Sequence, residues 1–320
     1  MVPGLGATPP MVATCALMIY WQPVIRDFRK GIHITQLLDQ DIKTKEVCNW
    51  KGVHLFHFMP SSCSQKTRIV FNLKDIAWQS HLIDLGKNKQ YSPWYLGINP
   101  RGLVPTLVLD GTVHIESNDI IQLIDQKFPE IRLIPQGFES QMSELLRHED
   151  DLHLDLRTLS FRFTQPKAKA LRSPEDLKNY REGGTGTVQG KKDPNKEREI
   201  AFWETVARDG ITDQAVQISA TRFRVALSEL DDRLTSNPFL LGKSLSILDI
   251  AWFVYANRLV RCGYPLERLH PQVNTWFRSL RDRPEFAGEI VVPPEVQKAV
   301  EAIHRQQEET DTTLIDVAGL

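Results

Sequence analysis

Residues 60–68, PSSCSQKTR, place two serines and a cysteine directly ahead of a basic run with helical spacing. The first amides of a helix stabilise an anion, so a thiol there ionises more readily than a free thiol, whose pKa is about 8.5. A thiolate at Cys63 can attack a disulfide or a sulfur adduct. A hydroxyl at Ser61 or Ser62 can instead donate a hydrogen bond to the thiolate of a bound ligand. Both chemistries stay open at this point, and we favour the serine role.

Residues 103–118 carry a second group of ligand-facing features. Pro105 stands at the entry of a strand, where it removes a ladder donor and leaves the backbone N–H and C=O of Val104 available to an extended peptide. Ser117 opens a helix, whose first amides favour a carboxylate, and Glu116 beside it suits an amino group. Together with the serines and cysteine, these features indicate a small peptide that carries a free amino-acid end and a sulfur.

The elements that must position these residues follow from periodicity. A strand is predicted at 53–58 and a short buried strand at 81–85, with an amphipathic helix between them from 64 to 77. Two further strands flank Asp110-Gly111, a dipeptide typical of a two-residue hairpin turn. A helix capped by Ser117 or Asn118 then runs to Pro129. This order predicts a small mixed sheet with helices on its faces.

The second half of the chain has helical signals only. Apolar spacing predicts helices over 139–163 and 212–234. Ser246 and Asp249 form a capping-box pattern at the start of another helix. Between the first two helices, residues 165–199 are rich in Gly, Pro, Lys and Glu, which predicts an exposed insertion because such a composition buries little apolar surface.

Composition excludes several classes of function. The 320 residues carry a formal net charge of -1, which gives no electrostatic reason to expect nucleic acid as a partner. Four scattered cysteines without a C-x-x-C pair predict no metal site, no disulfide framework and a reducing, cytoplasmic location. The apolar stretch 11–25 is too short to span a bilayer, so no stable membrane insertion is expected.

The motifs taken in order resemble the glutathione transferase superfamily over roughly residues 52–290. The matching pieces are SSCSQKTR, NPRGLVPTLVLDG, ESNDII and NPFLLGKSLSILDIAWF. The first piece resembles the zeta-type branch, which includes maleylacetoacetate isomerases, and the related reductive dehalogenases. The long insertion resembles that of the β-etherase-like branch.

The resemblance implies an α/β thioredoxin-like domain with a mixed four-stranded sheet, followed by an all-α helical-bundle domain. We therefore expect five segments: an N-terminal extension of unknown order at 1–50, a glutathione-binding domain at 51–135, a helical substrate domain at 138–290 with its insertion at 165–199, and a tail at 291–320.

The resemblance also implies roles for single residues. Val104, before a cis Pro105, would bond the cysteinyl backbone of glutathione, and Glu116 and Ser117 would hold its γ-glutamyl end. The activating residue would lie within Ser61, Ser62 and Cys63. Asn118 and Asp119 depart from the family pattern, in which small or apolar residues are usual, and put the hold on the glutamyl end in doubt.

The function that follows is glutathione-dependent transfer or isomerisation of a small electrophilic compound, apolar or aromatic. One alternative is Cys63-dependent reductive dehalogenation or ether cleavage through a mixed disulfide with glutathione. Another is a non-catalytic binding or interaction protein with the same fold. The resemblance further implies a homodimer.

Overall fold

The computed structural model describes residues 34–165 and 171–320. The apolar stretch 11–25 and the rest of the chain before residue 34 lie outside the described residues. No helix in the described part is long and apolar enough to cross a membrane. Among the same residues, no group of three or more His, Cys, Asp or Glu side chains is arranged to hold a metal ion.

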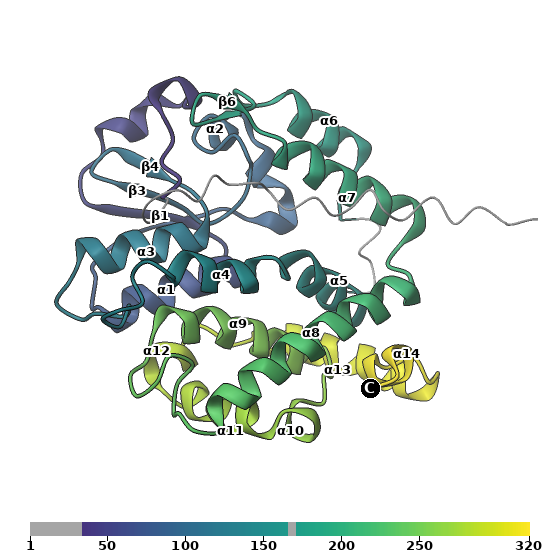
Figure 1. The fold of residues 1–320 in the computed structure, drawn as a ribbon. Helices are drawn as coiled ribbons and strands as arrows, with labels where there is room; N and C mark the ends of the chain where they lie inside the picture. Colours follow the sequence, from purple (N-terminus) through teal and green to yellow (C-terminus); the bar gives the residue numbers. More distant parts are fainter. Residues whose placement is uncertain (1–33, 166–170) are drawn as a thin grey trace, which may run out of the picture. The chain divides into compact units, whose positions relative to one another are not determined.

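A four-stranded sheet organises the first part of the chain (Figure 1), in the order β2-β1-β3-β4. Strands β1 and β2 are parallel, and β3 is antiparallel to both β1 and β4. The mixed four-stranded sheet predicted from the sequence is thereby confirmed. Its elements are β1 (Val53–His57), α1 (Ser62–Leu73), β2 (Gln79–Leu82), α2 (Pro93–Leu96), β3 (Thr106–Leu109), β4 (Thr112–His114) and α3 (Ser117–Lys127).

Local sequence signals explain most of these elements. Asp110 and Gly111 have φ angles of 48° and 81°, as a two-residue hairpin turn requires, and Leu109 pairs with Thr112 across it. The strand predicted at 81–85 was wrong in position and burial: β2 is an edge strand, and Leu82 is 64% exposed. An edge strand that faces solvent needs no continuous apolar run, which explains the error.

Alternating side chains place the sheet between two hydrophobic cores. Leu55 and Leu107 face the core that α1 and α3 share with the helical domain. Phe56 and Val108 face a second core on the side of α2. Three residues that precede β1 are buried in this second core, so the sheet-containing domain begins before residue 51; they are Leu37, Ile42 and Val47.

The second part of the chain is mainly helical, as predicted, and Figure 1 shows α9 beside α1 and α4, against which it packs. Its helices are α4 (Met142–Asp150), α5 (His153–Thr164), α6 (Pro174–Glu182), α7 (Asn195–Asp209), α8 (Asp213–Leu234), α9 (Ile247–Arg261), α10 (Leu266–Leu269), α11 (Pro271–Arg281), α12 (Pro284–Ala287), α13 (Pro294–Glu309) and α14 (Leu314–Ala318).

The capping box predicted at the start of α9 is present. Ser246 accepts a hydrogen bond from the backbone N–H of Asp249, and the Asp249 carboxylate accepts from the backbone N–H of Ser246 at 2.9 Å. The same carboxylate also accepts from Leu240 and from the indole of Trp276. The buried Asp249 therefore starts α9 and also joins it to α11 and to the segment that contains Leu240.

The insertion differs from the predicted exposed segment. Its described part, residues 171–199, contains α6, the start of α7 and a small hairpin of β5 (Thr187–Val188) and β6 (Lys191–Lys192). Tyr180 is fully buried and stacks on Tyr91 with ring centroids 4.3 Å apart, and Val188 enters the second core of the sheet. Composition failed here because a few well-placed apolar and aromatic residues anchor an otherwise polar segment.

The C-terminal tail, predicted as a helix that frays, contains two helices. α14 begins with its own capping box, made by Thr313 and Asp316. Leu314 is buried in the main core. The tail therefore adds to the packing of the helical domain.

A buried ion pair joins the two parts of the chain. Lys66 in α1 and Glu149 in α4 have no exposed side-chain area, and Lys66 Nζ lies 2.8 Å from a carboxylate oxygen of Glu149. Lys66 also donates to Asn118 Oδ1 at 2.7 Å, and Asn118 donates to Glu149 at 3.0 Å. Asn118 thus supplies hydrogen bonds that the two charged groups do not make to each other, which is a condition for burying two charges.

Breaking this pair is expected to be severe. Lys66→Met leaves the Glu149 carboxylate buried without its cation, so we expect a loss of about 3–5 kcal/mol in the free energy of unfolding. Urea unfolding followed by circular dichroism measures it. The double variant Lys66→Met with Glu149→Leu removes both charges and is expected to recover most of the loss. A single variant within about 1 kcal/mol of wild type would contradict this account.

Candidate functional site

The register of the sheet brings three separate segments to one end. Phe56 pairs with Thr106, and Leu107 pairs with His114. If the β1–β3 pairing is extended by two residues, Val104 lies opposite residue 58. If the β3–β4 pairing is extended in the same way, Glu116 lies opposite Pro105. The loop that leads into α1, the Val104–Pro105 peptide and the start of α3 therefore lie together.

The Val104–Pro105 peptide bond is cis, as the resemblance implied. Val104 itself is largely buried. Neither the N–H nor the C=O of Val104 forms a backbone hydrogen bond with another of the described residues. These two groups are available to a ligand backbone.

Ser61 is the N-cap of α1. Its Oγ accepts a hydrogen bond from the backbone N–H of Ser64 at 3.3 Å, which leaves the hydroxyl proton of Ser61 to be donated elsewhere. Ser62 is the first residue of the helix. Both serines are half-buried, so they are accessible at the edge of the site.

Cys63 faces the start of α3 and the helical domain. Its Sγ lies 3.9 Å from Nδ1 of His153 in α5, and the Ser117 side chain is near enough to act on the pKa of the thiol. Burial raises the pKa of the Cys63 thiol, and the nearby charge of Lys66 offsets part of that rise. Burial thus opposes the acidification expected at a helix start, and its effect on the pKa of the thiol exceeds that of Lys66.

Lys66 and Arg68 separate in their roles. The charge of Lys66 lies close enough to Cys63 to lower the pKa of the thiol. Arg68 instead bonds the loop before α1. Arg68 donates to the backbone carbonyl of Met59 at 2.9 Å and pairs with Glu289 at 2.6 Å. The basic run after Cys63 is therefore buried and structural in large part.

Glu116 and Ser117 lie at the start of α3, but the cap predicted at Ser117 or Asn118 is wrong, because the N-cap is Glu116 and its side chain forms no capping hydrogen bond. Ser117 is the first helical residue and is buried, and Glu116 before it has a φ of 69°. A positive φ is unusual for glutamate and persists where the surroundings require it, often at binding sites.

The two departures from the family pattern, Asn118 and Asp119, serve packing. Asn118 bonds the buried Lys66, and Asp119 accepts from the backbone N–H and the hydroxyl of Thr35. These contacts account for polar residues at positions where small or apolar ones are usual.

Arg101 is a site residue that sequence reasoning missed. One of its guanidinium nitrogens pairs with Glu116, and the other two bond Asp193 of the insertion at 2.8 Å and 2.9 Å. Burial lowers the pKa of Arg101, but the two carboxylates outweigh that effect and hold the pKa above its usual value. The motif NPRG contains Arg101, but nothing in the sequence pointed to its distant partner.

The helical domain contributes four polar groups near Cys63. His153 Nδ1 lies 3.0 Å from the Tyr255 hydroxyl. Arg157 forms a two-oxygen ion pair with Glu199. Arg258 donates to the backbone carbonyl of Pro60, and burial, followed by the neighbouring Arg261, lowers its pKa to about 10. Arg258 differs from Arg157 in having no carboxylate partner among the described residues.

Two histidines on β1 and an arginine on α5 form contacts within the protein. His57 is buried between Ser80 and Arg68, and burial, aided by the charge of Arg68, lowers its pKa to about 4. His54 contacts His81 at 3.1 Å. Arg162 pairs with Asp213 at the surface. All three therefore have structural partners.

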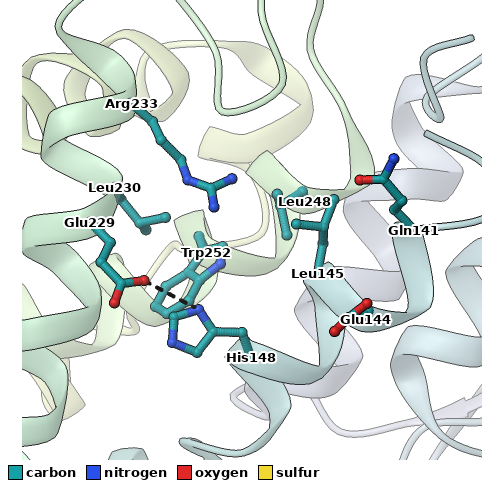
Figure 2. A pocket seen from close by; sticks show the side chains of 9 residues that line it. All are labelled: Gln141, Glu144, Leu145, His148, Glu229, Leu230, Arg233, Leu248 and Trp252. Atoms are coloured by element: carbon teal, nitrogen blue, oxygen red, sulfur yellow. Dashed lines mark ion pairs between the residues drawn. The ribbon is translucent and has the colours of Figure 1, made fainter. Parts of the chain in front are cut away.

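Two pockets among the described residues do not contain these side chains. One, of about 290 Å³, lies between α4, α8 and α9, and Figure 2 shows His148 and Glu229 at its edge beside Trp252. The other, of about 470 Å³, lies where residues 40–43 meet the insertion. Neither includes Ser61, Cys63 or Ser117.

Comparison with known proteins identifies the family. Residues 60–127 match the family model "Glutathione S-transferase, N-terminal domain", and residues 213–279 match "Glutathione S-transferase, C-terminal domain". Protein LigF from Sphingobium sp. is 25% identical over 240 residues, which cover 72% of this chain and 90% of LigF. The chain belongs to the glutathione transferase superfamily.

Further relatives agree with this assignment. The crystal structure of beta-etherase LigF superposes with a TM-score of 0.63 at 23% identity and covers 74% of this transferase and 98% of LigF. A zeta-class glutathione S-transferase from Euphorbia esula is 37% identical over 87 residues, which are 27% of this chain and 39% of the relative. A Pseudomonas fluorescens family member crystallised with two glutathione molecules superposes with a TM-score of 0.54 at 15% identity, covering 79% and 99% of the two chains. The thioredoxin-like domain followed by a helical domain is confirmed.

The Asp150 carboxyl group of this glutathione transferase, close enough to Glu116 to be affected by its charge, has a raised pKa. It follows Glu149 at the end of α4 and is half-buried. Burial, then the charges of Glu149 and Glu116, raises its pKa from 3.8 to about 7. Its carboxylate form is therefore less stable in the folded protein than in the unfolded chain.

The pH dependence of stability follows from this shift. Between pH 3.8 and about 7 the folded state binds the proton more tightly, so Asp150 destabilises the fold progressively as the pH rises through this range. Asp150→Asn removes that loss. We expect no gain below about pH 4, and a gain of about 2 kcal/mol at pH 8, limited by the solvent contact of the side chain.

Chemical unfolding at pH 4, 6 and 8 measures this gain. The control is Asp151→Asn, which removes the same charge from the exposed neighbour and is expected to change stability by less than about 0.5 kcal/mol at each pH. A gain for Asp150→Asn that is independent of pH would contradict the assignment.

Proposed function

We propose that this protein is a glutathione-dependent transferase or isomerase that acts on a small electrophilic compound. The observation that carries the proposal is the meeting of three segments at one end of the sheet: the start of α1, the cis Val104–Pro105 peptide and the start of α3. Cys63 at the start of α1 and Ser117 at the start of α3 are near enough for the Ser117 side chain to lower the pKa of the thiol.

Each segment suits one part of glutathione. The unpaired backbone N–H and C=O of Val104 can bond the cysteinyl residue as an added strand. Ser117 and the first amides of α3 can hold the γ-glutamyl carboxylate, and Glu116 can receive the amino group beside it. This arrangement directs the ligand thiol toward Ser61.

Ser61 then supplies the chemistry. Its hydroxyl donates a hydrogen bond to the sulfur of glutathione and stabilises the thiolate, which adds to an electrophilic carbon of the acceptor. In transfer by substitution, a leaving group departs from the acceptor with its bonding electron pair. In transfer by addition, the carbanion formed on the acceptor takes up a proton. In isomerisation, the adduct rotates about a single bond and then eliminates glutathione unchanged.

Cys63 carries the alternative, reductive cleavage. Its thiolate would attack the sulfur of a glutathionyl adduct, displace the organic group as a carbanion that takes up a proton, and form a mixed disulfide with glutathione. A second glutathione would release Cys63 as glutathione disulfide forms. The raised pKa of Cys63 favours the serine mechanism. The similarity to a beta-etherase favours including aryl ethers among the acceptors.

Arg258 supports a further property of the acceptor. Its guanidinium reaches the carbonyl of Pro60, next to Ser61, without a carboxylate to balance it. A carboxylate or phenolate on the acceptor would be attracted to this charge. We therefore propose aromatic or unsaturated electrophiles that carry an acidic group.

Ser61 and Cys63 are separated by two substitutions. Ser61→Asn retains a helix cap but has no hydroxyl, so we expect folding to persist and kcat/KM for conjugation to fall by about 10- to 100-fold. Cys63→Ser is expected to leave conjugation nearly unchanged. The measurement is product mass spectrometry and steady-state kinetics with glutathione and a panel of quinones, aryl ethers, haloacids and maleyl compounds.

Ser62→Ala is the matched control, because it removes the neighbouring hydroxyl. Full activity in Ser61→Asn with loss in Ser62→Ala would transfer the role to Ser62, and full activity in both would exclude the serine mechanism. Loss of adduct reduction alone in Cys63→Ser would instead establish the reductive reaction. A folded wild-type protein that neither binds immobilised glutathione nor gains thermal stability from it would be a non-catalytic member.

Homodimerisation is part of the proposal and is tested by light scattering. We expect about twice the mass of 36.6 kDa. A monomer at micromolar concentration, with unchanged glutathione activity, would show that the site is complete in one chain.

A further inference from the structure

His153 of the helical domain meets the start of α1. Its Nδ1 lies 3.9 Å from Cys63 Sγ, at the end of the sheet where the proposed glutathione site is assembled. The same nitrogen lies 3.0 Å from the hydroxyl of Tyr255 in α9. The imidazole is half-buried, whereas Tyr255 has no exposed area. His153 is therefore bonded to α1 and α9 through Nδ1 and still has contact with solvent.

The neighbours of the imidazole decide which ring nitrogen carries its proton. Burial raises the pKa of both groups that face Nδ1, so the Tyr255 phenol and the Cys63 thiol keep their protons at neutral pH. Glu149 is another acceptor close to the phenol, but Lys66 bonds both of its oxygens and Asn118 bonds one of them. The phenol therefore donates to Nδ1, and the proton of the neutral ring is on Nε2.

The ring is neutral at physiological pH. Burial, followed by the charge of Arg157, lowers the pKa of His153. The carboxylates of Asp150 and Glu149 oppose that shift, and Lys66 adds to it. Nε2 forms no hydrogen bond with another of the described residues. It is thus a neutral N–H donor that a ligand can use, and such a donor stabilises negative charge that a reaction develops beside it.

We propose that His153 is a further catalytic residue, whose Nε2–H donates a hydrogen bond to the negative charge that develops on the acceptor. The inference rests on the proposed function, because it adds a residue to the same site. In substitution, the charge is on the leaving group, which departs from an aryl ether with its bonding electron pair as a phenolate. In addition, the charge is on the carbanion, or on a carbonyl oxygen conjugated with it, until a proton from solvent arrives. Ser61 stabilises the thiolate that attacks, and His153 stabilises the charge that the attack displaces.

A purely structural role of His153 would depend on Nδ1, since that nitrogen makes both contacts within the protein. Two amide side chains separate the nitrogens. The amide of glutamine reaches the position of Nε2, whereas the shorter amide of asparagine reaches the position of Nδ1. His153→Gln therefore retains the proposed donor, and His153→Asn retains the internal hydrogen bond.

The probe is para-nitrophenol, a phenol of the kind that an aryl ether releases, whose absorbance reports its own ionisation. It is titrated with pH on the full chain in the presence of glutathione. We expect the wild-type protein to lower the pKa of the bound phenol, His153→Asn to raise that pKa by about 1 and His153→Gln to stay close to wild type. In turnover of aryl ethers, His153→Asn is expected to lower kcat about 10- to 100-fold and to leave KM for glutathione within about twofold.

His148→Asn is the matched control. His148 lies on α4 with 48% of its side chain exposed, beside Glu229, and does not reach the site. The same substitution there is expected to change neither the pKa of the bound phenol nor kcat. Circular dichroism checks folding, and His153→Leu, which has no donor, replaces His153→Asn if the latter does not fold.

Nitrogen NMR of the wild-type imidazole tests the tautomer without any variant, and a proton on Nδ1 in place of Nε2 would overturn the proposal. Equal pKa values of the phenol on both amide variants, or a wild-type protein that leaves this pKa unchanged, would also overturn the role of His153. These results leave the proposed function standing. Failure of the wild-type protein to bind glutathione in a calorimetric titration would instead reject the proposed function itself.

Discussion

Lys66 and Glu149 place two opposite charges, 2.8 Å apart, where neither side chain has any exposed area. Such a pair is tolerated only when its geometry is good and its remaining polar groups are bonded, and Asn118 meets that second condition. The pair fixes α1 against α3 and α4 at once. Cys63 lies one turn before Lys66 on α1. The ion pair that fixes α1 therefore also positions the thiol next to His153.

The consequence for chemistry is a site built from two domains around a neutral thiol. Cys63 Sγ lies 3.9 Å from His153 Nδ1, and the Ser117 side chain acts to lower the pKa of the thiol. Its removal from solvent opposes ionisation more strongly than Lys66 favours it. Ser61, which retains a hydroxyl proton while capping α1, is then better suited to stabilise a thiolate that the ligand brings.

The insertion shows how a polar segment becomes part of a domain. Val188 enters the core beneath α2, and Asp41, from the residues before β1, accepts hydrogen bonds from Thr187 and Gly190. Through Tyr180 and Asp193 the same segment reaches Arg101. Residues from outside the sheet-containing domain therefore hold Arg101, the ion-pair partner of Glu116.

The sequence by itself determined the features that depend on neighbouring residues: the Asp110-Gly111 turn, the Ser246–Asp249 cap and the helix start at Ser117. Turn and cap preferences act over four residues or fewer, so a local pattern contains the whole interaction. The tertiary structure decided the burial of the insertion and the charge partners of the site. Lys66 and Glu149 are separated by 83 residues, and Arg101 and Asp193 by 92. The sequence does not distinguish these residues from the other lysines, arginines and carboxylates of the chain. Only the fold decides which of them are buried away from water and must therefore form ion pairs.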